Sequence, residues 1–120
     1  MESKAAALAL SALAHQGRLG IFRLLVQAGQ DGLPAGEIAR RAGVAPSTLS
    51  ASLNILAQAG LVAARRDGRS IIYTAGYDRM TDLLLHLMED CCQGRPEVCA
   101  PLAELARRAA CCAQPGTASQ

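Results

Sequence analysis

Two short helical segments, separated by only two residues, constrain the fold of this chain more than any other feature. The first segment begins at Pro34 and stops at Gly43, and the second begins at Pro46. Proline favours the first turn of a helix and glycine ends one, so both boundaries are well marked. Because only Val44 and Ala45 lie between the segments, the two helices must cross at a steep angle.

The second of these helices, residues 46–58, has two different faces. Leu49, Leu53 and Leu56 recur at helical spacing and predict the buried side. The opposite side is small or polar and uncharged; it carries Ser47, Ala51, Asn54 and Gln58, with Thr48 and Ser50 beside them.

A β-hairpin is predicted directly after this helix. Residues 61–66 and 70–75 are β-prone and flank Asp67-Gly68, a strong two-residue turn signal. Arg65, Arg66 and Arg69 lie at its tip. The order helix, tight turn, helix, hairpin predicts a winged helix-turn-helix fold, mainly α with a small β-hairpin.

This order of elements predicts binding to double-stranded DNA. A face of small polar residues fits the major groove, where Asn54 and Gln58 can each pair with adenine through two hydrogen bonds. The hairpin arginines supply charge for phosphates, and residues 34–76 hold five arginines against two acids. Two tyrosines, one phenylalanine and no tryptophan disfavour single-strand recognition by stacking. A solvated helix and a charged turn remain the alternative explanation.

Further helices are predicted at residues 5–14, 17–28 and 77–91. The last carries an apolar stripe of Met80, Leu83, Leu84, Leu87 and Cys91. A chain of 120 residues is the usual size of one domain, and it has no apolar run of the roughly 18 residues that span a bilayer. We therefore expect one cytoplasmic domain.

Five cysteines crowd the C-terminal part of the chain. Cytoplasmic thiols stay reduced, so ligand or redox chemistry is favoured over a disulfide framework. Cys91, Cys92 and Cys99 lie around a predicted helix end at Gly94 and Pro96, where the loop can bring three sulfurs together. Three thiolates suit trivalent arsenic or antimony, whereas zinc usually takes a fourth ligand. Cys111 and Cys112 form a possible additional pair, and Cys91 also fits a simple core position.

Four segments, Ala12–Leu25, Ile38–Leu53, Leu56–Val62 and Arg66–Tyr73, resemble the ArsR/SmtB family of metalloregulatory repressors, and the likeness covers roughly residues 8–92. The resemblance implies a homodimer built mainly by the first and last helices, and release from operator DNA when the ligand binds. Certain arsenic-responsive members carry a vicinal cysteine pair and a third cysteine at this position. The recognition helix departs from the family pattern at Ala51 and Ser52, where a large or basic residue and a histidine are usual.

The sequence therefore predicts a DNA-binding and dimerisation domain over residues 1–92 and a cysteine-bearing extension over residues 93–120. Trivalent arsenic or antimony at Cys91, Cys92 and Cys99 is the expected inducer, and no enzymatic activity is expected. The residues expected to contact DNA are Ser47, Thr48, Ser50, Ala51, Ser52, Asn54, Gln58, Arg65, Arg66 and Arg69.

Three alternatives stay open. A redox or persulfide switch of the same fold would need only two of the thiols. A zinc site on the last helix would use His86 and Glu89, but Tyr73 and Ala75 stand near where its other ligands would be. A thiol enzyme or metal carrier would need an activating base, and no histidine lies beside the cysteines in the sequence.

Overall fold

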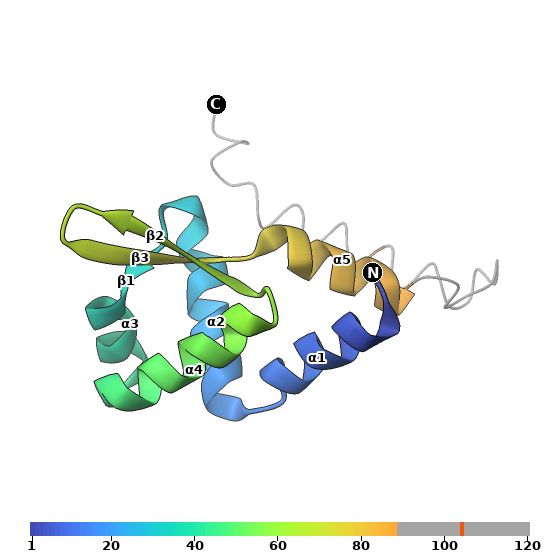
Figure 1. The fold of residues 1–120 in the computed structure, drawn as a ribbon, viewed down its shortest axis with the longest axis horizontal. Coiled ribbons are helices and arrows are strands. Elements are labelled where there is room, and N and C mark those ends of the chain that lie inside the picture. Colours follow the sequence, from blue (N-terminus) through green and yellow to red (C-terminus); the bar gives the residue numbers. More distant parts are fainter. Residues whose placement is uncertain (89–103, 105–120) are drawn as a thin grey trace. The chain divides into compact units, whose positions relative to one another are not determined.

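The computed structural model describes residues 1–88 and 104 of the chain. The chain divides into two compact units, residues 1–86 and 87–120, and the predicted boundary at residue 92 lies outside the described residues. Figure 1 shows helices and a small sheet in the order α1 (Ser3–Leu13), α2 (Gln16–Ala28), the single 3-10 turn η1 (Gly29–Asp31), β1 (Leu33–Pro34), α3 (Ala35–Ala42), α4 (Pro46–Gln58), β2 (Val62–Asp67), β3 (Ser70–Ala75) and α5 (Tyr77–Met88).

One apolar core joins the helices to the base of the sheet. The predicted burial of one face of α4 is confirmed, since Leu49, Leu53 and Leu56 are all buried. Burial of such side chains is the main stabilising contribution to folding. The other large members of the core come from α2, α3, the α4–β2 connection, β2 and α5: Ile21, Phe22, Leu25, Ile38, Leu61, Val62 and Leu83.

The helix-turn-helix forms as the sequence predicts. Gly43 ends α3 in the left-handed conformation, with a φ of 69°, and its amide donates to the carbonyl of Ala39. Pro46 occupies the first turn of α4, whose observed bounds match the predicted ones. The tight connection therefore places α4 against the core beside α3, and the winged helix-turn-helix fold is confirmed.

The sheet has three antiparallel strands in the order β1-β3-β2, so that β3 is central. Asp67 pairs with Ser70, which makes Gly68 and Arg69 the two turn residues, one position later than the predicted Asp67-Gly68. Strand β1 corrects a prediction as well, since Pro34 was predicted to begin a helix and instead ends a two-residue strand. Pro34 is extended and lies at the edge of the sheet, where its missing amide costs no ladder bond.

Two side chains tie helix ends to other parts of the fold. The Tyr77 hydroxyl donates to the carbonyl oxygen of Val26 at 3.0 Å and to that of Leu25 at 3.4 Å, near the end of α2. The Arg18 guanidinium donates from Nε to the carbonyl of Ala12 at 2.7 Å, at the end of α1. Carbonyls in the last turn of a helix lack the partner that the next turn would supply, so both side chains bond acceptors exposed at a helix end.

The outer faces of α1 and α5 are unusually apolar. Leu8 and Leu10 of α1 are exposed, as are Leu84 and Leu85 of α5, with Leu85 at 63%. The predicted α5 stripe is therefore core only in part, because Leu83 is buried whereas Leu84 and Leu87 are about half exposed. In the described part of the chain, no helix is long and apolar enough to cross a membrane.

Replacement of Gly32 by alanine should destabilise the protein by about 2 to 4 kcal/mol. Gly32 has a φ of 69°, and an added Cβ would lie 2.4 Å from the carbonyl oxygen of Tyr73. The matched control is Gly20→Ala in α2, where nothing lies within 4 Å of an added Cβ; it should stabilise by about 0.4 to 1 kcal/mol. Urea unfolding measures both, and a Gly32→Ala variant as stable as the wild type would contradict the assigned backbone.

Candidate nucleic-acid interface

The exposed face of α4 is the centre of the candidate interface. Because the leucines of α4 point into the core, the side chains on its other side point to solvent. Six of the seven predicted DNA-contacting residues of this helix lie there: Ser47, Thr48, Ser50, Ala51, Asn54 and Gln58. All six are small or uncharged, so they leave room for close approach and offer hydroxyl and amide groups for hydrogen bonds.

Ser52 is the exception among the predicted residues. Its side chain is 8% exposed, since it lies three residues after Leu49 and four before Leu56, on the buried side of the helix. We therefore leave Ser52 out of the interface. The helical spacing contains this information, because Ser52 falls on the same side of the helix as Leu49 and Leu56.

The hairpin β2–β3 forms the wing, and its three arginines differ in their contacts. Arg65, Arg66 and Arg69 are all exposed. Arg65, however, donates from Nη1 to the carbonyl oxygen of Gln30 at 3.2 Å and from Nη2 to that of Asp31 at 3.0 Å. Sequence patterns could not show this role, because the acceptors lie more than thirty residues earlier in the chain.

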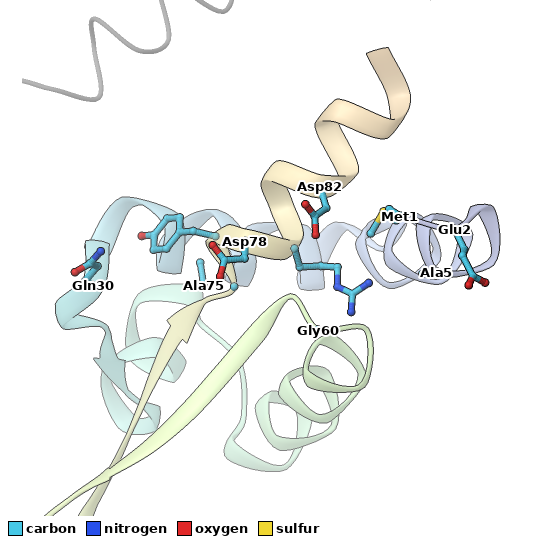
Figure 2. Close-up of a pocket in the computed structure, with 11 residues that line it drawn as sticks. Met1, Glu2, Ala5, Gln30, Gly60, Ala75, Asp78 and Asp82 are labelled. Atoms are coloured by element: carbon cyan, nitrogen blue, oxygen red, sulfur yellow. The ribbon is translucent and has the colours of Figure 1, made fainter. Parts of the chain in front are cut away.

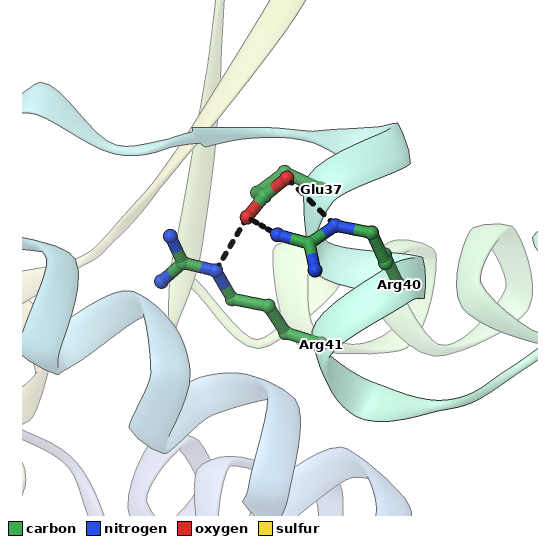
Figure 3. A network of polar contacts seen from close by, with 3 residues as sticks. All are labelled: Glu37, Arg40 and Arg41. Carbon is green, nitrogen blue, oxygen red and sulfur yellow. Dashed lines mark hydrogen bonds and ion pairs between the residues drawn. The ribbon is translucent and has the colours of Figure 1, made fainter.

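Three charged side chains of α3 form a network just before the turn of the helix-turn-helix (Figure 3). The Glu37 carboxylate accepts hydrogen bonds from Arg40 and, at 2.6 Å, from Nε of Arg41. The two arginines are largely exposed, at 70% and 47% of their side chains. The hydrogen bond from Arg40, and then that from Arg41, hold the pKa of Glu37 below its ordinary value of 4.5. Sequence analysis did not single out Arg40 and Arg41, although they add positive charge just before α4.

An open cleft near the start of α5 has the opposite charge (Figure 2). Glu2 lies beside α1, whereas Asp78 and Asp82 lie one turn apart on α5. Arg79 is the one basic side chain among the described residues that line this cleft. Three carboxylates repel phosphate, so DNA is not expected to approach this side.

The predicted thiol site lies outside the described residues, as do Cys91, Cys92, Cys99, Cys111 and Cys112. Glu89, half of the alternative zinc pair, lies outside them too. Within residues 1–88 and 104, no three His, Cys, Asp or Glu side chains are close enough to hold a metal ion. His15 has a structural role instead, since its Nδ1 accepts from the amides of Gly17 and Arg18 and caps α2.

Comparison with known proteins agrees with this geometry. The helix-turn-helix domain family matches residues 13–65. The uncharacterized HTH-type transcriptional regulator Rv0081 of Mycobacterium tuberculosis is 40% identical over 73 residues, which are 60% of this chain and 61% of that protein. The chain thus matches less than two thirds of the length of this relative.

Solved structures extend the likeness over more of the fold. The homodimeric winged helix-turn-helix DNA-binding domain Mb0332 of Mycobacterium bovis, a possible ArsR-family transcriptional regulator, is 34% identical with a TM-score of 0.60; the match covers 71% of this chain and 77% of that one. Reduced HlyU from Vibrio cholerae is 31% identical with a TM-score of 0.57, over 72% of this chain and 90% of that one. This chain therefore belongs to the helix-turn-helix domain family, and ArsR-like winged helix transcriptional regulators are its structural neighbours.

Acid should weaken the contribution of Glu37 to stability. A carboxyl whose pKa is lower in the folded state stabilises the fold above its unfolded pKa, and this contribution is lost as the pH falls through the folded value. The difference in unfolding free energy between wild type and Glu37→Gln should thus be constant above about pH 5 and shrink below about pH 4.5. Urea unfolding across this range measures it; a difference that grows on acidification would refute the assigned network.

Proposed function

We propose that this protein is a homodimeric repressor that binds operator DNA and is released when a thiol-binding inducer occupies its cysteines. One observation carries the DNA-binding part: an exposed, uncharged face of α4 stands next to a wing that bears three arginines. In this fold the second helix of the helix-turn-helix enters the major groove.

The side chains on α4 divide into two groups by their chemistry. Ser47 and Thr48 lie in the first turn of the helix, where hydroxyls and backbone amides bond phosphates. Asn54 and Gln58 lie further along and are long enough to reach adenine edges with two hydrogen bonds each. Arg66 and Arg69 on the wing then supply contacts to phosphate that are independent of sequence.

The apolar outer faces of α1 and α5 support a homodimer. Leu8 and Leu10 on one helix and Leu84 and Leu85 on the other expose large side chains that a second copy would cover. The Mb0332 domain of Mycobacterium bovis is homodimeric, which favours the same assembly here. A dimer would present two α4 helices about 34 Å apart, the spacing of successive major grooves.

The inducer is proposed from the donor chemistry of the sequence. Cys91, Cys92 and Cys99 offer three sulfur ligands, which suit trivalent arsenic or antimony; Cys111 and Cys112 are candidates for a second pair. In the sequence, the pair Cys91-Cys92 begins four residues after Leu87, the last of the exposed leucines of α5. An inducer that favours the released state by about 1.4 kcal/mol would weaken operator binding tenfold.

A thiol redox switch of the same fold is the second candidate. The structural neighbour HlyU of Vibrio cholerae was solved in a reduced form, and this supports a thiol redox switch as the second candidate. Such a switch would close a disulfide between two of the cysteines and would need an oxidant such as peroxide or a persulfide.

Asn54→Ala should weaken binding to operator DNA roughly 5- to 100-fold, because one bidentate base contact is worth about 1 to 3 kcal/mol. Binding to unrelated DNA should hardly change. Gln27→Ala, an exposed glutamine of α2, is the control and should bind as wild type. Fluorescence anisotropy with DNA selected from a random pool gives both affinities, and an equal loss on all DNA would exclude base reading by Asn54.

Arsenite should release the reduced protein from this DNA, and Cys99→Ser should abolish the release. Cys111→Ser tests the second pair: release as in the wild type would confine the inducer to Cys91, Cys92 and Cys99. The same titration with zinc and with peroxide separates the candidates: release by peroxide alone would replace the arsenic proposal by the redox switch. Failure of the wild type to bind any DNA would remove both.

A further inference from the structure

Arg65 differs from the other wing arginines in what its guanidinium contacts. Its two terminal nitrogens donate to the carbonyl oxygens of Gln30 and Asp31, at 3.2 and 3.0 Å. These residues are the last two of the 3-10 turn η1, which follows α2 directly. The wing is therefore attached to the C-terminal end of a distant helical segment by two hydrogen bonds from one side chain.

The acceptors are suited to a cation. Carbonyls at the end of a helical turn lack partners within the turn and carry partial negative charge. A guanidinium presents several donors in a rigid planar fork, so it can bond two neighbouring carbonyls at once. A lysine has a single flexible ammonium group and would not fix the same geometry.

The register of the sheet shows what this contact spans. Arg65 on β2 lies opposite Ile72 on β3, and Ile72 lies opposite Pro34 on β1. Strand β3 is central, and η1 precedes β1 on the far side of it. The Arg65 side chain thus crosses the central strand and joins the outer strand of the wing to the segment before the opposite edge.

The anchor point is itself held in place. Gly32, next to η1, packs so closely on β3 that an added Cβ would lie 2.4 Å from the Tyr73 carbonyl oxygen. Upstream, Tyr77 donates to the carbonyls of Leu25 and Val26 near the end of α2. Residues 25–32 are therefore fixed from both sides, and a contact to them restrains the wing.

We propose that Arg65 is a positioning residue: it sets the angle of the wing, so that Arg66 and Arg69 meet the DNA backbone, and does not itself bind DNA. The inference rests on the proposed DNA-binding function. The two hydrogen bonds from Arg65 to η1, which we call the wing anchor, are present in the protein without DNA. Successive residues of a strand point to opposite faces, so Arg65 and Arg66 are directed to different partners.

The test compares Arg65→Lys with Arg66→Lys, since both keep the charge of the wing. Backbone amide exchange of residues 65–72 is measured first in the free protein. Arg65→Lys should speed exchange in the wing about fivefold and leave the core amides of α2 and α4 unchanged, while Arg66→Lys should match wild type. Operator affinity should then fall about three- to tenfold for Arg65→Lys, whereas Arg23→Lys, at an exposed arginine of α2 outside the interface, should bind as wild type.

Each other result decides against the proposal. If the wing exchanges at the same rate in Arg65→Lys and Arg66→Lys, Arg65 does not anchor the wing and the proposal fails. Faster exchange throughout the core of Arg65→Lys, with a lower melting temperature, would make Arg65 a general stability residue. If the wild type binds no DNA but amide exchange in the wing of Arg65→Lys is still faster, the proposed DNA-binding function is wrong. The structural role of Arg65 in holding the wing is then still supported.

Discussion

The packing of the leucine face of α4 is the constraint on which the rest of the structure depends. Leu49, Leu53 and Leu56 are buried among side chains of α2 and α3, and this fixes the rotation of the helix about its own axis. A helix that buries one side must present the other to solvent. The hydrophobic core thus determines which polar groups of α4 are available to a nucleic acid, and it holds them on a rigid element.

Hydrogen bonds from side chains to backbone carbonyls attach the peripheral elements, and three residues make them in the same way. Arg18, Tyr77 and Arg65 each donate to backbone carbonyls near the C-terminal end of a helical segment: α1, α2 and η1, respectively. Each carbonyl group near such an end needs a partner, and each donor comes from another element. The start of α5 is therefore attached to the last turn of α2, and the wing is attached to η1, which follows α2 directly.

Much of the fold was predictable because it depends on local chemistry. Pro46 and the leucine spacing define α4 correctly, and Gly43 ends α3 as expected. Strand β1 was missed because two residues carry no periodicity; only pairing with β3 makes them a strand. Leu84 and Leu87 of the α5 stripe are exposed although the stripe was predicted to be buried, since an apolar pattern does not specify the surface that covers it. The exposed leucines then point to a second copy of the chain.

The sequence by itself determined the helix-turn-helix, the wing, the uncharged face of α4 and the set of five cysteines, since each depends on residue type and short-range spacing. Only the tertiary structure decided the roles of individual side chains. Arg65 donates to carbonyls of η1 although it resembles a phosphate contact, and the Tyr77 hydroxyl donates to carbonyls near the end of α2. Both outcomes depend on groups far apart in the sequence, and folding alone brings such groups together.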